Sequence, residues 1–136
     1  RTIGDLLRRR DEPSLRPFAS RPLMVGGDVL TQRRIRVLTA RADVAASSEI
    51  IPGLYECSPV DAERMLAIGA AEADEFCFFA AVCQWSPEQM ASELERAVWL
   101  PAACSAGALL GAARLPSVEA AEGEPPPHAA YFALTE

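Results

Sequence analysis

The chain has no lysine and no asparagine, and His128 is its only histidine. Its four cysteines, Cys57, Cys77, Cys83 and Cys104, form no C-x-x-C pair. A zinc site needs several nitrogen or sulfur ligands at short, regular spacings, so this set excludes one, and we expect neither a metal nor a cofactor. We expect the cysteines to be small buried hydrophobic residues in a reducing compartment, with a regulatory disulfide as the alternative.

Long apolar runs and catalytic motifs are also missing from the sequence. No window approaches the 18 uncharged apolar residues that a membrane-spanning helix requires, so we expect any membrane contact to be indirect. Neither a G-x-S-x-G elbow nor an H-E-x-x-H helix is present. The Gly26-Gly27 pair lacks the spacing of a phosphate-binding loop, so we interpret it as a turn.

Carboxylates are the remaining candidates for acid–base chemistry. Glu88, Glu93 and Glu95 lie in one predicted helix together with Arg96. A solvated helix face explains this pattern better than a pair of carboxylates with tuned pKa values. We therefore predict that the protein is not an enzyme and has no catalytic residue.

Charge is distributed very unevenly along the chain. The formal net charge of the 136 residues is −6. Residues 1–41 carry ten arginines and four acids, a net charge of +6, whereas residues 42–136 carry a net charge of −12. The length and the 50% hydrophobic content indicate one globular domain with a packed core.

Arginines of the basic third and the two tryptophans are the candidate partner-binding residues. They are Arg8, Arg9, Arg10, Arg33, Arg34, Arg36, Trp85 and Trp99. Guanidinium groups can bind phosphates or an acidic protein surface, but a solvated helix end is the simpler explanation of the arginine run. The tryptophans flank a predicted helix, where a core position is favoured over a partner contact. Because the rest of the chain is acidic, we expect nucleic-acid binding to be opposed.

Local patterns in the first half predict a helix followed by strands. Thr2 can cap a short helix that the basic run ends, and the three prolines of residues 11–22 indicate a loop. Leu23-Met24-Val25 reads as a strand, and the alternation at residues 34–37 predicts a second strand with arginines on its solvent side. Residues 49–56 indicate two strands joined by a Pro-Gly pair at a type II turn or a sheet edge.

The second half predicts two capped helices around an apolar strand. Ser58 and Ser86 are each followed by a proline, which is typical of a helix start, and Gln89 is placed to complete a capping box. The first helix should run to about Ala70 and the second through Ala97. Their expected positions leave residues 76–84 as the central strand, with Cys77 and Cys83 on the same side of it.

Three further expectations concern details of the second half. The apolar stripe of the first helix is expected to be Val60, Met65, Ala67 and Ile68. Residues 98–101 should form a short strand, and residues 102–113 a buried strand or helix. Residues 115–136 are rich in proline and glutamate, so we expect an extended tail after a single domain of residues 1–114. This order of elements indicates an α+β fold with a mixed sheet.

Several segments in order resemble the YqgE/AlgH family, over roughly residues 2–110. They are Val25-Gly26-Gly27-Asp28, Ile51-Pro52-Gly53-Leu54-Tyr55, Phe78-Phe79, Trp85, Glu88-Gln89-Met90, Glu93-Leu94 and Trp99. The string from Trp99 to Ser105 is similar to the plastid branch of that family. Two departures stand out, because relatives usually carry a proline at Asp28 and a glycine-tyrosine pair near Ala80–Val82.

The resemblance implies an α+β fold in which a bifurcated sheet curls into a pseudo-barrel with two or three covering helices. It implies no established cofactor or reaction. Relatives begin with further strands before Thr2, so we expect this chain to lack them and to leave a sheet edge that needs a partner.

These features favour an interaction protein. We expect an accessory subunit in the chloroplast stroma, bound through protein subunits at the stromal face of a membrane complex, with a photosystem and its antenna as the host. The alternative is a free regulatory protein of the AlgH type in a bacterial-type cytoplasm, which influences gene expression. Direct DNA contact would then use the candidate arginines.

Overall fold

The computed structural model describes residues 1–27 and 34–114. The helices are α1 (Ile3–Leu7), η1 (Pro13–Phe18), α2 (Pro59–Ala67), η2 (Ala73–Glu75), α3 (Pro87–Glu95) and α4 (Ala106–Arg114), of which η1 and η2 are 3₁₀ helices. The strands are β1 (Leu23–Val25), β2 (Ile35–Thr39), β3 (Ser48–Ile51), β4 (Leu54–Cys57) and β5 (Phe76–Ala80). The predicted tail of residues 115–136 and the candidate Arg33 lie outside the described residues.

The five strands form one mixed sheet in the order β1-β5-β2-β4-β3. β1 and β5 are parallel, and the other neighbouring pairs are antiparallel. The α+β class and the mixed sheet are therefore confirmed. The sheet is open among the described residues, with β1 and β3 at its two ends, so the curling into a pseudo-barrel stays a prediction.

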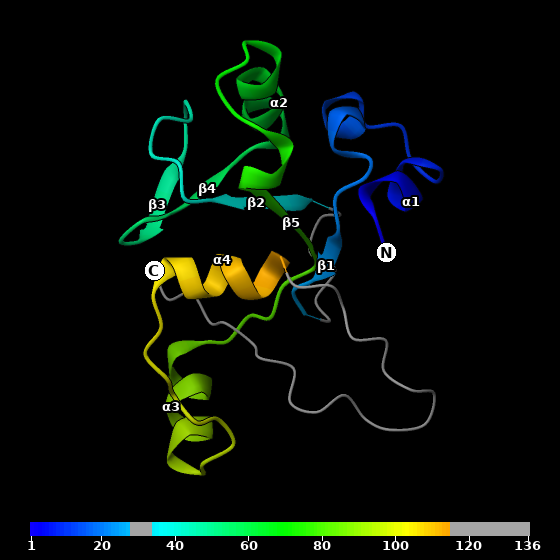
Figure 1. The fold of residues 1–136 in the computed structure, drawn as a ribbon. Helices are drawn as coiled ribbons and strands as arrows, with labels where there is room; N and C mark the ends of the chain where they lie inside the picture. The colour runs from blue at the N-terminus through cyan, green and yellow to red at the C-terminus, as the bar shows by residue number, and fades with distance from the viewer. Residues whose placement is uncertain (28–33, 115–136) are drawn as a thin grey trace.

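Helices cover both faces of the sheet (Figure 1). The helices α1, η1 and α2 lie on one face and α4 lies on the other, whereas α3 projects beyond α4. Alternate residues of β5 point to the two faces, as strand geometry requires. Phe76 and Phe78 belong to the larger core cluster with Phe18 and Met65, and Cys77 belongs to a smaller cluster with Leu54 and Leu110.

All three predicted helix starts are confirmed, each with the expected cap. Thr2 and Asp5 form a reciprocal capping box at α1. Ser58 accepts a hydrogen bond from the backbone N–H of Asp61 at α2, and Ser86 accepts one from that of Gln89 at α3. The side chain of Gln89 donates to Glu93 instead of returning to Ser86, so only half of the predicted capping box forms. These caps satisfy backbone donors that have no partner inside the helix.

The expected loop of residues 11–22 is wrong in one respect. It contains η1, whose Leu15 and Phe18 are completely buried. The ring centroid of Phe18 lies 4.7 Å from that of Phe78 and 5.8 Å from that of Phe76. Pro13 and Pro17 are compatible with η1 because Pro13 occupies its first turn and the 3₁₀ segment is short. This aromatic contact closes the larger core.

The predicted apolar stripe of α2 is partly wrong. Met65 is buried, but Val60 is 51% exposed and Ile68 is 69% exposed. Ala62 is fully buried in their place, so the helix approaches the core through a small side chain. The helix also ends earlier than expected, at Ala67, with Gly69 in the left-handed conformation.

The hairpin of β3 and β4 is confirmed, and both predicted settings of its Pro-Gly pair apply. Gly53 has a φ of +79°, as the third position of a type II turn requires, and β3 is an end strand. Glu49 fixes the turn by accepting hydrogen bonds from the Gly53 N–H at 3.0 Å and the Tyr55 hydroxyl at 3.1 Å.

Residues 76–84 form a shorter strand than predicted. β5 ends at Ala80, and β2, its neighbour, occupies the middle of the strand order. Ala81 turns the chain out of the sheet with a φ of +61°. Cys83 therefore lies beyond the strand and does not share a strand face with Cys77.

The Gly26-Gly27 pair allows close packing against residues 81–83, which follow β5 and which we call the exit segment. A Cβ on Gly26 would lie 2.7 Å from the Ala81 carbonyl oxygen, and a Cβ on Gly27 would collide with the backbone of Val82 and Cys83. Neither glycine has a positive φ. The pair is therefore needed for close backbone approach, and its interpretation as a turn misses that role.

The remaining differences concern residues 98–104. No strand forms at residues 98–101, which follow α3 as an irregular segment, and α4 begins only at Ala106. Cys57 and Cys77 are buried as predicted, but Cys83 is half-buried and Cys104 is exposed. The expectation of four buried thiols is thus wrong for two of them.

Both ends of the sheet carry features that discourage edge pairing. β1 has only three residues and follows Pro22, and β3 has an irregular register between Glu49 and Ile51. Short edge strands, prolines and bulges limit pairing with another chain. An open edge is therefore a weaker candidate for docking than the projecting α3 segment.

Candidate interaction surface

We define the α3 arm as residues 85–100, which comprise α3 and the segments flanking it. It leaves β5 through the exit segment and returns to α4, and it lies apart from the sheet (Figure 1). None of the residues of α3 is buried. A nine-residue helix is marginal by itself in water, so other contacts must hold this one in place.

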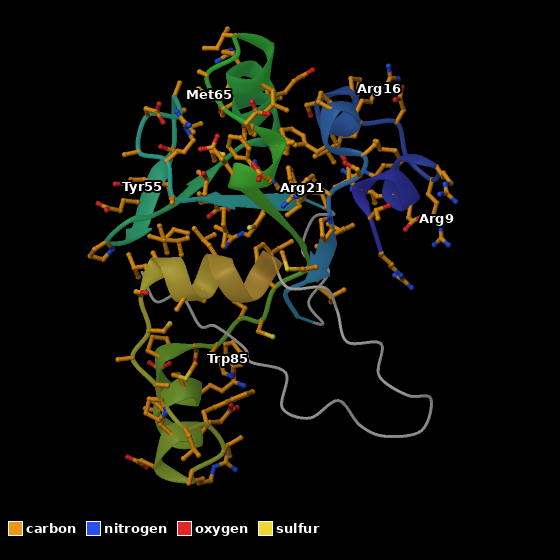
Figure 2. All side chains as sticks on the ribbon, in the orientation of Figure 1. Arg9, Arg16, Arg21, Tyr55, Met65 and Trp85 are labelled. Carbon is orange, nitrogen blue, oxygen red and sulfur yellow. The ribbon has the colours of Figure 1, made fainter. Side chains whose placement is uncertain are left out.

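Two tryptophans and a glutamate supply those contacts, and we call them the Trp–Glu–Trp clasp. The indole N–H groups of Trp85 and Trp99 both donate to the same carboxylate oxygen of Glu93, at 3.0 Å and 2.5 Å. The two rings meet edge to face, with centroids 5.5 Å apart and planes at 88°. Edge-to-face contact is a favourable arrangement for aromatic rings. The clasp ties the chain before α3 to the chain after it, and Figure 2 shows Trp85 at the point where the arm begins.

The second oxygen of Glu93 is also used. Gln89 donates its side-chain N–H to that oxygen at 2.9 Å, one helical turn before Glu93. The hydrogen bond from Trp99, followed by that from Gln89, lowers the pKa of Glu93 below its ordinary value. Glu93 is therefore ionised at neutral pH and accepts three hydrogen bonds within the arm.

A left-handed residue brings Trp99 back to the clasp. Ala97 has a φ of +55°, and its N–H and that of Val98 bond to the carbonyls of Leu94 and Glu93. This is the Schellman arrangement, in which glycine is usual at the left-handed position. The arm maintains this conformation with an alanine, at a cost of about 1 kcal/mol relative to glycine.

Apolar side chains remain exposed on the arm. Leu94 is 39% exposed, Val98 53% and Leu100 87%. Three exposed apolar residues lie within seven positions of one projecting segment, whereas Val25, Val60 and Ile68 are distributed over β1 and α2. Apolar side chains that gather on a surface mark interaction sites more often than single ones do.

The predicted arginines lie elsewhere, in two separate places. Arg8 pairs with Asp5 at 3.1 Å and Arg10 with Glu12 at 2.8 Å, and Arg9 is exposed at the end of α1 (Figure 2). Arg8 and Arg9 border a groove of about 300 Å³ near the N-terminus. Nearby carboxylates thus neutralise much of the basic run, as expected for a solvated helix end.

Arg34 and Arg36 lie at the start of β2, the middle strand of the sheet, and line a cavity of about 500 Å³. Arg36 pairs with Glu56 of the neighbouring strand β4 at 3.2 Å. This cavity shares no described lining residue with the groove at Arg8 and Arg9. The structure therefore brings the two tryptophans together but separates the candidate arginines into two groups.

Glu93 is the member of the clasp that sequence reasoning missed. The sequence pattern favours a solvated face for the acidic residues of α3, and the only sequence signal for Glu93 is that tryptophans stand on both sides of it. Trp85 and Trp99 lie outside α3, so their contacts with Glu93 cross the two segments that flank the helix, and no periodicity within one element predicts such contacts. Trp85 and Trp99 are half-buried, so neither a core position nor a fully exposed partner contact describes them completely.

The thiol that lines the cavity is unsuited to nucleophilic chemistry. Cys57 lines the cavity, and burial raises the pKa of its thiol to about 12. A thiol with that pKa is protonated at neutral pH and is a poor nucleophile.

In residues 1–27 and 34–114, no group of three or more histidine, cysteine, aspartate or glutamate residues could hold a metal ion. Within the same residues, no helix has the length and apolar character that would let it cross a membrane.

Comparison with known proteins gives one match. The sequence profile described as AlgH-like matches residues 1–119. That range includes all the described helices and strands, the α3 arm and both arginine groups. No curated protein and no solved structure matches the chain at a significant level.

Proposed function

Because the chain belongs to the AlgH-like family, we propose that it is a non-enzymatic accessory subunit that docks through the α3 arm on a large plastid assembly. The host we propose is a photosystem with its antenna, contacted at its stromal face. The arm is the observation that carries this proposal, since it projects from the sheet, buries no residue of its helix and exposes Leu94, Val98 and Leu100.

Preorganisation by the clasp supports docking. The three hydrogen bonds on Glu93 hold the arm in one shape before any partner binds. An interface residue that is already ordered loses less conformational entropy on binding. The arm can therefore present its apolar side chains to a partner at low entropic cost.

The plastid assignment rests on the string from Trp99 to Ser105. The structure places residues 100–105 on the surface, in the segment between the arm and α4. A string that does not pack into the core is free to contact a partner, and this position supports its use in recognition.

The alternative of a free regulatory protein that contacts DNA has less support. Arg8 and Arg10 are paired with carboxylates of their own segment, and Arg36 with Glu56. Of the described arginines, Arg8 and Arg9 border one cavity and Arg34 and Arg36 line another, a separation that favours a continuous DNA-binding surface less than one shared cavity would.

Size fractionation of native complexes tests the proposal. The wild-type chain should migrate with a complex many times larger than its own 14.6 kDa. Leu100→Glu should move most of it to the free-protein fractions, because a buried charge disfavours an apolar interface. Finding the wild-type chain only in the free fractions would contradict the proposal.

Ile68→Glu is the matched control for this experiment. Ile68 is 69% exposed at the C-cap of α2, away from the arm, so its substitution introduces the same charge at a similarly exposed apolar position. The control should keep the chain in the large complex. An equal loss with Ile68→Glu would attribute the effect to charge or folding and not to the arm.

A further inference from the structure

The cavity of about 500 Å³ lies where several strand ends converge. The start of β2 and the ends of β4 and β5 are neighbours there, because Ile35 pairs with Ala80 and Val37 with Cys57. Ser48, the first residue of β3, and Ser58, the N-cap of α2, contribute further lining. This volume lies within the range typical of sites for small molecules.

Both charged and neutral polar side chains line the cavity. They are Arg34, Arg36, Ser48, Glu56, Ser58 and Gln84. Within the described residues, Arg34 has no ion pair, and the Nε of Arg36 lies 3.2 Å from a carboxylate oxygen of Glu56. Positions 34 and 36 are both exposed and lie on the same side of the chain, so their two guanidinium groups face the same region.

The wall of the cavity is held in an uncommon conformation. Ala46 and Ala81 both line it, with φ values of +55° and +61°. Left-handed alanines are energetically unfavourable and persist where the surrounding structure fixes them. Gly26 and Gly27 pack closely against residues 81–83 and fix one side of the wall. Part of the cavity wall is therefore backbone that close packing holds in place.

We propose that this cavity binds a small oxyanion, with one phosphate or carboxylate group held by Arg34 and Arg36. Both arginines present planar N–H donors that match these groups, and Ser48 is a hydroxyl donor in the same lining. Glu56 and the nearby Asp61, which bonds to Ser58, limit the positive charge. The site therefore selects a small anion and not a nucleic acid.

A titration with inorganic phosphate, followed by NMR of the backbone amides and arginine Nε groups, tests this site. We expect saturable shifts at Arg34, Arg36 and Ser48 with a millimolar dissociation constant. Acetate in a parallel titration shows whether a carboxylate serves equally. Duplex DNA should give no shift at these residues, and DNA-specific shifts there would overturn the proposal.

Two variants and a control make the test specific. Arg34→Gln should weaken phosphate binding about tenfold, because a charge-assisted contact is lost. Glu56→Gln should strengthen it several-fold, because it removes the competing carboxylate from Arg36. Arg9→Gln, at the other arginine group, should leave it unchanged. Equal binding by wild type and Arg34→Gln, or non-saturating shifts, would overturn the proposal.

Discussion

Glu93 determines the shape of the α3 arm through one carboxylate. Its two oxygens receive hydrogen bonds from Trp85, Trp99 and Gln89. The pKa of Glu93 is lowered from an ordinary value of 4.5, first by Trp99 and then by Gln89. The stabilisation from the ionised group is fully present above pH 4.5 and is lost as the pH falls through the lowered value.

Fluorescence can follow this loss without a label, because the chain has only the two tryptophans of the clasp. The wild-type emission should change as Glu93 is protonated in acid. Glu93→Gln preserves the side-chain shape but cannot titrate, so its emission should be nearly constant over the same range. Glu95→Gln is the control and should titrate like the wild type. The same transition in Glu93→Gln would show that Glu93 does not control the clasp.

Arg41 is a second residue whose ion pairs hold two segments of the chain together. Its guanidinium contacts Asp43 twice, at 2.9 Å and 2.6 Å, and Glu75 at 2.9 Å. It thereby joins the segment after β2 to the one before β5. Arg41 is the main cause of the lowered pKa of Asp43, whereas the lowered pKa of Glu75 is due first to the backbone of Glu72 and then to Arg41.

Arg41→Gln should make the melting temperature less dependent on pH. Both carboxyl groups have lowered pKa values, so their contribution is present above their ordinary values and is lost as the pH falls. The wild type should be more stable at neutral pH, and the gap should close as the pH falls through the lowered pKa values of the two carboxyl groups. Thermal unfolding at a series of pH values measures this gap, with the exposed Arg9→Gln as the control. A gap that stays constant into acid would contradict the ion-pair account.

At the scale of elements, the glycine pair controls how β1 meets the segment after β5. Gly27→Ala should destabilise the fold by about 1–3 kcal/mol, because the new methyl group collides with the backbone of Val82 and Cys83. Urea unfolding measures the change. Gly111→Ala is the matched control, since its Cβ would meet nothing within 4 Å in α4. It should stabilise by about 0.5–1 kcal/mol, as expected inside a helix. A neutral Gly27→Ala would show that the close approach has no structural role.

Local chemistry explains which elements could be predicted from the sequence. Helix starts at Thr2, Ser58 and Ser86 follow from caps within three or four residues, and the strand at Ile35 follows from alternation. The burial of Phe18 could not be predicted in this way, because it depends on β5, nearly 60 residues later in the chain. The clasp was missed for the same reason, since its hydrogen bonds cross the two loops around α3.

Burial within elements was less predictable than the elements themselves. Val60 and Ile68 fit an apolar period, yet α2 packs through Ala62 and Met65 instead. The reason is the close approach of the helix to η1 and the sheet, which a small side chain allows. Residues 98–101 have an apolar pattern typical of a strand, but the turn at Ala97 directs Trp99 to Glu93.

At the scale of the whole molecule, the described basic residues of the N-terminal third are separated from the exposed apolar side chains of the α3 arm. The basic residues of the N-terminal third are largely paired or lie beside the cavity, and the α3 arm carries exposed apolar side chains among acidic ones. Both sheet edges are short or irregular. The arm is therefore the surface that best explains how this protein would join a larger assembly.

Hydrogen exchange of the chain in its native complex and in the free state tests that claim most directly. We predict that amides of residues 87–100 exchange more slowly in the complex, because docking buries the arm, while amides of α2 exchange equally in both states. Equal exchange of the arm in both states, or protection confined to α1 and its arginines, would contradict docking through the α3 arm.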